Sequence, residues 1–311
     1  MMRRFWGPRR GKGRCGRSGD RTMVVAERIC DVREHVAKAR RAGSRIGLVP
    51  TMGALHAGHA SLLRAARADG GYVVASIFVN PTQFGPGEDL ARYPRPLEKD
   101  LQVCRREGVD LVFTPSAAEM YPDGPGTTVH VPVMSETMCG ASRPGHFDGV
   151  STVVAKLLAI VGPDAAYFGE KDAQQLAIVR RMVRDLNLPV EIRGCPLVRD
   201  ADGLATSSRN VYLSPEERRR ALALGRALAA ARDRVRAGER DARALARDLR
   251  QRLDAADGLA TEYVAVVDPD TLEDLERIGD QVLVAAAVRV GPTRLIDNIL
   301  LRHLGTGGEG G

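Results

Sequence analysis

The segment 45-RIGLVPTMGALHAGHASLLRAARADGGYVVASIFV-79 decides the fold that the sequence predicts. Within it, RIGLV (45–49) is a short apolar run and YVVASIFV (72–79) is a nearly continuous one, as expected of buried strands. HASLLRAARA (59–68) lies between them and has apolar residues at helical spacing. A strand, a helix and a second strand in succession indicate a βαβ unit with parallel strands.

The same alternation continues through the first two hundred residues. The apolar patterns predict helices over 26–42, 96–107, 149–161 and 173–187, and strands over 110–114, 165–168 and 190–198. Repeated βαβ units predict an α/β fold whose mostly parallel sheet carries helices on both faces. Ligands of such open sheets bind beyond the carboxyl ends of the strands, which is where the turn at 50–58 lies.

The pattern changes after Asp200. Two helices rich in Ala, Arg and Leu are predicted over 215–237 and 241–256, and two strands over 261–267 and 281–290. These elements indicate a smaller α+β domain. We therefore expect four parts: a disordered basic extension over 1–22, a larger domain over 23–198, a C-terminal lid domain over 199–303 and a disordered tail over 304–311.

The net charge of +7 is concentrated at one end of the chain. Residues 1–22 contain eight Arg or Lys and one Asp, and the 38 basic and 38 acidic residues that remain balance each other. The body of the protein therefore gives no electrostatic reason to expect nucleic-acid binding. A nucleic-acid-binding arm at 1–22, or translation that begins at Met23, are the alternatives to a disordered extension.

The cysteines and the hydropathy indicate a soluble cytoplasmic protein without membrane contact. The five cysteines are scattered and contain no C-x-x-C pair, which favours reduced thiols over disulfides or a zinc site. The chain also lacks a run of the roughly 18 apolar residues that a membrane helix needs.

The turn 49-VPTMGALHAGH-59 is the first candidate site. Gly53 and Gly58 would let the backbone approach a ligand closely, and the helix expected to begin near His59 would present free N–H groups to an anion. His56 and His59 could then donate hydrogen bonds to phosphate oxygens. A tight turn with incidental histidines and a metal pair are the alternatives, although no third metal ligand has supporting spacing.

Other polar segments follow further predicted strands. Asn80 and Gln83 stand in 77-IFVNPTQF-84 and could bind a small hydroxylated or carboxylated substrate, although Asn-Pro also opens turns. In 143-RPGHFDGV-150, Asp148 is expected to cap the following helix, with His146 in the loop before it.

Two more segments complete the set. In 167-YFGEKDAQQ-175, Lys171 could reach phosphates and Gln175 could face the cleft, whereas Asp172 has capping-box spacing to Gln175. The junction 204-LATSSRN-210 offers two hydroxyl groups and an arginine that suit triphosphate binding, or it is an ordinary linker.

Together these motifs resemble the pantoate–β-alanine ligase family of the nucleotidyltransferase superfamily. The resemblance covers roughly residues 24–302 and rests on the ordered set PTMGALHAGH, FVNPTQF, EDLARYPR, GHFDGV, FGEKDAQQ and SSRN. It implies a Rossmann-like domain followed by a small C-terminal domain, a homodimer, and ATP with Mg²⁺. The implied reaction joins pantoate and β-alanine through a pantoyl adenylate and releases pyrophosphate and AMP.

The resemblance also implies roles for individual residues. Catalytic roles fall on His59, His56, Lys171 and Arg209, with His59 as the proton donor. Gln83 would contact pantoate and β-alanine, and Gln175 and Asn80 would contact pantoate. ATP would be bound by Met52, Gly53, Ala54, Leu55, His56, Ala57, Gly58, His59, Gly169, Glu170, Lys171, Asp172, Val198, Thr206, Ser207, Ser208 and Arg209. The motifs do not identify the Mg²⁺ ligands.

Two positions depart from the family pattern. Thr206 stands where methionine commonly precedes Ser-Ser-Arg, and Ala173 stands where an aromatic residue is frequent. Neither change removes a charged group or a proton donor, so we expect activity to survive. The competing functions are a different adenylyltransferase, which would leave AMP on its product, and a non-catalytic nucleic-acid-binding protein.

Overall fold

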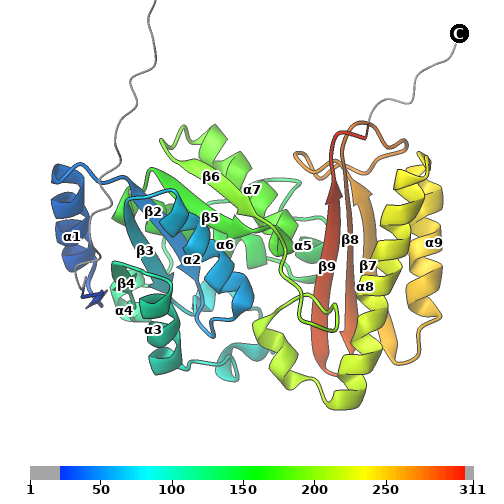
Figure 1. Cartoon of the computed structure of the whole chain (residues 1–311), viewed down its shortest axis with the longest axis horizontal. Helices are drawn as coiled ribbons and strands as arrows, with labels where there is room; N and C mark the ends of the chain where they lie inside the picture. Colours follow the sequence, from blue (N-terminus) through cyan, green and yellow to red (C-terminus); the bar gives the residue numbers. More distant parts are fainter. Residues whose placement is uncertain (1–21, 305–311) are drawn as a thin grey trace, which may run out of the picture.

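The larger part of the molecule is built on a six-stranded parallel sheet (Figure 1). The computed structural model describes residues 22–304. The strands lie in the order β1-β4-β3-β2-β5-β6, and every neighbouring pair is parallel. They are β1 Val24–Ala26, β2 Ile46–Thr51, β3 Tyr72–Ile77, β4 Leu111–Phe113, β5 Ala165–Gly169 and β6 Glu191–Cys195. The predicted parallel α/β sheet is confirmed.

Helices cover both faces of this sheet. Helices α1 Ile29–Arg41, α6 His146–Val161 and α7 Ala173–Asp185 pack on one face, and α2 Ala57–Ala68 and α3 Leu97–Arg106 pack on the other. The shorter helices are α4 Ala117–Met120, α5 Cys139–Ser142 and the 3₁₀ turns η1 Pro81–Gln83, η2 Asp89–Ala91, η3 Glu170–Asp172 and η4 Ser208–Tyr212. No helix within the described residues is long and apolar enough to span a membrane.

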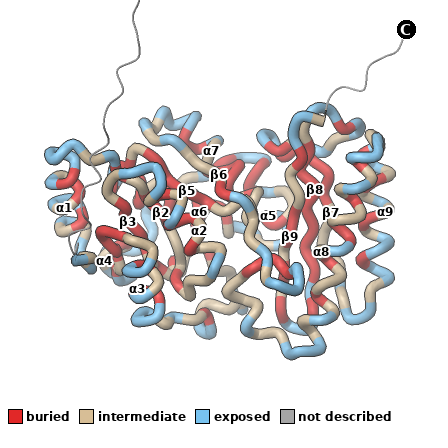
Figure 2. Tube along the Cα trace, in the orientation of Figure 1, coloured by how far each residue is buried: buried red, intermediate tan, exposed pale blue. Residues whose placement is uncertain are grey.

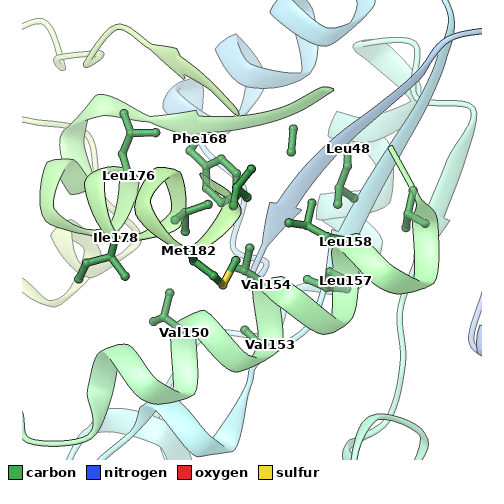
Figure 3. Packing of buried hydrophobic residues seen from close by; sticks show 14 of the residues in the cluster. Leu48, Val150, Val153, Val154, Leu157, Leu158, Phe168, Leu176, Ile178 and Met182 are labelled. Atoms are coloured by element: carbon green, nitrogen blue, oxygen red, sulfur yellow. The ribbon is translucent and has the colours of Figure 1, made fainter. Parts of the chain in front are cut away.

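The central strands are apolar on both sides because both sides are covered. In β5, Ala166 and Phe168 pack with α6 and α7, whereas Ala165 and Tyr167 pack toward α2. Figure 3 shows the first of these layers, where Phe168 meets side chains of α6 and α7. Removing such surface from water contributes about 25 cal/mol for each Å² buried, which explains why these strands are continuous apolar runs.

A smaller α+β unit follows, as predicted. Its antiparallel strands are β7 Leu259–Val267, β8 Val282–Val290 and β9 Thr293–Leu301, in the order β7-β8-β9. Helices α8 Pro215–Arg236 and α9 Ala242–Asp254 cover one face of this sheet. Its other face packs against the larger unit through Ala265, Leu283 and Ala285. Figure 2 shows the result: the buried residues, drawn in red, lie along the strands and along the helix faces that pack on them.

The sequence did not predict β1 and β9. Strand β1 has three residues and, within residues 22–304, pairs with β4 alone, so it is too short to show an alternating apolar pattern. Strand β9 contains Arg294, Asp297 and Asn298, which interrupt its apolar pattern. These polar side chains are tolerated there because each has a partner in the folded chain.

Two predicted helix caps are wrong. Helix α6 begins at His146, after Gly145 adopts a left-handed backbone (φ 78°), and Asp148 instead contacts the His130 ring (Oδ1 to Nδ1, 2.8 Å). Asp172 precedes α7 but makes no side-chain cap, because the 3₁₀ turn η3 leads directly into the helix. The helix that was expected to begin near His59 begins at Ala57, and His56 is its N-cap.

The strand order places the loop after β2 beside the loop after β5. These two strands are neighbours, yet the chain continues from β2 toward β3 and β4 on one side and from β5 toward β6 on the other. Such a reversal leaves a crevice at the carboxyl edge of the sheet. The predicted extension at 1–22 and tail at 304–311 lie, except for residues 22 and 304, outside the described residues, and the predicted domain limits stay predictions.

We predict that Gly149→Ala destabilises the fold although alanine favours helices. A Cβ at Gly149 would lie 2.4 Å from the Thr82 carbonyl oxygen and 2.6 Å from the Gln83 nitrogen, so backbone would have to move. Overpacking of this kind costs about 1–3 kcal/mol. Urea unfolding would measure the change, with Gly126→Ala as the matched control, since nothing lies within 4 Å of a Cβ there. Equal stabilities of the two variants would contradict this account.

Candidate active site

A cavity of about 410 Å³ lies between the two units at the carboxyl edge of the parallel sheet. Its wall brings together the turn after β2, the loop after β3, η3, the junction 204–212 and the inner face of β9. Segments far apart in the sequence thus meet at the switch point of the strand order. This is the position at which open parallel sheets bind ligands.

Most of the predicted site residues line this cavity. They are Met52, His56, Gly58, His59, Asn80, Gln83, Gly169, Lys171, Asp172, Gln175, Val198, Thr206, Ser207, Ser208 and Arg209. Five predicted residues are not part of the wall: Gly53, Ala54, Leu55, Ala57 and Glu170. The first three instead shape the turn on which the histidines stand.

That turn is held by a carboxylate that the sequence did not reveal. Gly53 and Ala54 both have positive φ angles, of 82° and 50°. Asp100 of α3 is 2% exposed, and its carboxylate accepts hydrogen bonds from the backbone N–H groups of Ala54 (2.9 Å) and Leu55 (2.7 Å). Burial raises the pKa of Asp100, while these two bonds favour its ionised form. The paired bonds stabilise an otherwise unfavourable backbone conformation.

His56 and His59 cap the start of α2. The Nδ1 atom of His56 accepts from the Gly58 N–H (3.2 Å), and Nδ1 of His59 accepts from the His56 N–H (3.4 Å). A nitrogen that accepts cannot carry the proton, so in each neutral ring the proton is on Nε2. The centroids of the two rings lie 4.1 Å apart. The capping geometry therefore makes both histidines Nε2–H donors.

Both histidines are neutral at neutral pH. Burial, and then the Lys171 ammonium, lower the pKa of His56 from 6.5 to about 4. Burial and the neighbouring His56 ring lower the pKa of His59 to about 3. An anion bound beside the rings would raise both values again, because it favours the charged form.

Two of the cations on the cavity wall, Lys171 and Arg209, come from different segments of the chain. The Lys171 ammonium lies 3.5 Å from a carboxylate oxygen of Asp172. Arg209 donates two hydrogen bonds to Asp89, from Nε and Nη2 at 3.0 Å each, and its guanidinium carbon lies 5.8 Å from the centre of the Tyr93 ring. Although burial opposes the charged form, the bonds to Asp89 raise the pKa of Arg209. Each cation thus has a protein carboxylate as partner.

The junction loop is anchored across the cavity. The Ser208 hydroxyl donates to the Ala54 carbonyl (3.2 Å), and the Tyr212 hydroxyl donates to the Arg92 carbonyl (3.1 Å). The Thr206 hydroxyl is used within the loop, where it donates to Asp200 (2.7 Å). The loop is therefore attached to the turn after β2 through Ser208.

Gln83 is held in a defined orientation. Its Oε1 accepts from Nδ2 of Asn80 (3.2 Å), so its NH₂ group points the other way, toward Met52 Sδ (3.1 Å). Asn80 is 1% exposed, and it also donates to the Gly149 carbonyl and accepts from the Tyr121 hydroxyl. Gln83 can thus donate to acceptor atoms of a ligand.

Arg143 is a second residue that the sequence did not single out. It pairs with Glu88 through two hydrogen bonds of 2.7 and 2.6 Å. Its Nη1 lies 2.9 Å from Nε2 of His146, whose Nδ1 lies 2.8 Å from the Gln83 carbonyl. Burial and Arg143 lower the pKa of His146 to about 4. The sequence could have revealed Arg143, because it opens the segment 143–150 that was considered for His146. No sequence signal pointed to Asp100.

The described residues contain no cluster of three or more His, Cys, Asp or Glu that could hold a metal ion. The polar wall instead combines neutral N–H donors, amides and several cations, Lys171, Arg143 and Arg209 among them. Such a wall can bind a polyanionic ligand next to a small hydroxylated one.

Comparisons with known proteins identify the family of this chain. The family model for pantoate-beta-alanine ligase matches residues 24–300. The pantothenate synthetase of Moorella thermoacetica is 57% identical over 279 residues, which cover 90% of this chain and 99% of that protein. The crystal structure of pantothenate synthetase from Thermus thermophilus superimposes with a TM-score of 0.84 at 47% identity, covering 91% of this chain and 99% of the other.

A third relative was solved with ligands. The pantoate-beta-alanine ligase of Francisella tularensis, complexed with beta-gamma ATP and beta-alanine, has a TM-score of 0.73 and 33% identity, and the match covers 90% of this chain and 98% of that one. The architecture described above is therefore the one found in these enzymes.

We predict that acid destabilises the protein between pH 7 and 5 through His56, His59 and His146. Their folded pKa values lie below 6.5, so at pH 5 the folded chain keeps them neutral while the unfolded chain protonates them. Each proton taken up on unfolding lowers the stability by about 1.4 kcal/mol per pH unit. Urea titrations across this range would measure the slope.

The variant His146→Gln is the internal control, because it should remove about one proton from the uptake. A free energy of unfolding that does not change between pH 7 and 5 would contradict the buried, neutral state of these rings.

Proposed function

The chain belongs to the pantoate–β-alanine ligase family, and we propose that it condenses pantoate with β-alanine in a reaction driven by ATP. Members of this family form a carbon–nitrogen bond. In our proposal the reaction proceeds through pantoyl adenylate and releases pyrophosphate and AMP. The observation that carries it is the convergence of two Nε2–H donors with Lys171 on one cavity wall at the switch point of the sheet.

Binding of ATP is supported by the chemistry of that wall. The start of α2 presents a positive dipole end, and His56, His59, Lys171 and Arg209 can all donate to phosphate oxygens. The family relative complexed with beta-gamma ATP and beta-alanine supports the same assignment. Of the predicted ATP contacts, Met52, Gly58, Gly169, Asp172, Val198, Thr206, Ser207 and Ser208 also stand on the wall. Gly53, Ala54, Leu55, Ala57 and Glu170 would act by shaping its turns.

In the first step, a carboxylate oxygen of pantoate attacks the α-phosphorus of ATP. The new P–O bond forms as the bond to pyrophosphate breaks, so negative charge grows on the leaving phosphate oxygens. Donors fixed in advance at these oxygens are each worth on the order of 10²–10³ in rate. His59 would donate its Nε2 proton there, and Arg209 would exchange its bonds to Asp89 for bonds to phosphate.

Mg²⁺ would enter with the nucleotide. Mg²⁺ is usually held by one or two carboxylates together with substrate phosphates, which fits a wall that contains Asp172 but no acidic cluster among the described residues. The ion would neutralise phosphate charge, and the donors named above act on the same charge from the protein side.

In the second step, the amine of β-alanine attacks the acyl carbon of pantoyl adenylate. The new C–N bond forms as the C–O bond to AMP breaks. The NH₂ group of Gln83 can donate to both substrates, and Gln175 to pantoate. Asn80 would act by orienting Gln83, since its own amide is engaged within the protein. The anchored junction loop would protect the adenylate from water.

We place this activity in the cytoplasm, in a homodimer that acts on small molecules and engages neither nucleic acid nor membrane. The scattered cysteines support the location, and the absence of a charge excess outside residues 1–22 argues against nucleic-acid binding, whereas the homodimer is what the family resemblance implies.

The decisive experiment follows pyrophosphate and AMP after mixing the protein with ATP, Mg²⁺ and pantoate, with and without β-alanine. We expect a pyrophosphate burst with pantoate alone, and sustained AMP release only when both acids are present. Without pantoate-dependent pyrophosphate, the acceptor of the adenylyl group would be a different molecule.

We predict that His59→Ala lowers the rate of pantoate-dependent pyrophosphate release by about 10²–10³-fold, because a donor to the developing charge is lost. The matched control is His35→Ala on α1, a histidine outside the cavity wall. Stopped-flow detection of pyrophosphate would give both rates. Near-parental release by His59→Ala would refute the role of this ring.

A further inference from the structure

Strand β9 presents two adjacent polar residues to opposite sides of the smaller sheet. Asp297 and Asn298 are 3% and 7% exposed, in a strand that is otherwise mostly apolar. Side chains alternate along a strand, so Asp297 points to the α8 side and Asn298 to the larger unit. Figure 1 shows β9 as the strand of the small sheet that faces the larger unit. Buried polar groups persist in such places when they have partners.

The partners of Asn298 are two carbonyl groups of the loop after β5. Its Nδ2 donates to the carbonyl oxygen of Glu170 at 2.9 Å and to that of Lys171 at 2.8 Å. Both hydrogens of the amide are thereby used. An aspartate could not replace the asparagine, because an ionised carboxylate only accepts hydrogen bonds. The backbone that carries Lys171 is thus attached to the smaller unit.

The partner of Asp297 belongs to the segment that carries the second cation, Arg209. Its carboxylate accepts two hydrogen bonds from Arg199, of 2.7 and 3.0 Å, and a third from the Asn298 N–H at 2.8 Å. Arg199 begins the hairpin that pairs with Ala205 and continues into the loop carrying Arg209. Two neighbouring residues of β9 therefore hold the segments that deliver the two cations.

We propose that Asn298 is a positioning residue for Lys171 in the adenylation step. This inference rests on the proposed function and adds a residue that touches neither substrate in it. The turn η3 has only three residues between β5 and α7. Among the described residues, Asn298 is the one side chain of the smaller unit that donates hydrogen bonds to the carbonyl groups of this turn. Without that tie, the Lys171 ammonium would sample positions away from the phosphates.

The expected effect is large because phosphoryl transfer depends on placement. A displacement of about 1 Å in a group near the reaction can cost on the order of 10²-fold in rate. We expect Asn298→Ala to lower the single-turnover rate of pyrophosphate release by about 10–100-fold at saturating ATP and pantoate. The KM for pantoate should change much less than the rate, because Gln83 stands on a different segment, the loop after β3, and Gln175 stands within helix α7 rather than in the turn that Asn298 holds.

The test combines Asn298→Ala with Lys171→Ala in a double-mutant cycle. If Asn298 acts through Lys171, removing the amide should cost little once the ammonium is gone. An equal fold-loss in both backgrounds, or parental activity of Asn298→Ala, would overturn the proposal. If Asn298 had a purely structural role, Asn298→Ala would lower the free energy of unfolding and would reduce the rate by the same factor with and without Lys171.

Two further variants keep the result interpretable. Asn298→Leu has the same branched shape without N–H groups, so it replaces Asn298→Ala if the smaller side chain impairs folding. Gln281→Ala is the control, since it removes an amide of the same unit whose bond goes to Asp270, away from the cavity. A parent without pantoate-dependent pyrophosphate release would refute the proposed function itself, whereas an active parent with an active Asn298→Leu would refute only this inference.

Discussion

The site depends on how the backbone N–H groups are satisfied where β2 turns into α2. The chain passes through two residues with positive φ, and the first N–H groups of the helix have no partners within it. Asp100 accepts from the turn, and the Nδ1 atoms of His56 and His59 accept from the helix start. Because the rings cap the helix through Nδ1, the proton of each neutral ring is on Nε2. The same two hydrogen bonds therefore cap the helix and fix both rings as Nε2–H donors.

Electrostatic partners complete this arrangement. In the structure Lys171 pairs with Asp172, and Arg209 pairs with Asp89, so neither cation is left uncompensated in a half-buried cavity. Such pairs hold the cations near the wall, and in the proposed reaction they would be exchanged for bonds to phosphate, whose oxygens carry more charge. The smaller sheet contributes by holding both cation-bearing segments through β9. The cavity is therefore a property of the two units together.

The elements that the sequence predicted correctly are those whose apolar residues recur with a clear period. The long buried strands and amphipathic helices were predicted because their burial on one or both faces leaves a clear period. Strand β9 was missed because Asp297 and Asn298 break that period, and their partners lie far away in the sequence. The caps expected at Asp148 and Asp172 were wrong because the preceding backbone, a left-handed Gly145 and a 3₁₀ turn, decided how each helix begins.

By itself, the sequence determined the class of fold and the family, and most of the site residues that it predicted do line the cavity, since short motifs at strand ends must meet at one edge of a parallel sheet. Only the tertiary structure decided the tautomers, the amide orientation and the turn geometry of these residues. The Nε2–H form of the histidines depends on cap distances, the orientation of Gln83 depends on Asn80, and the turn depends on Asp100 from another helix. These contacts depend on the exact backbone path and on residues brought together by folding, and no local pattern encodes them.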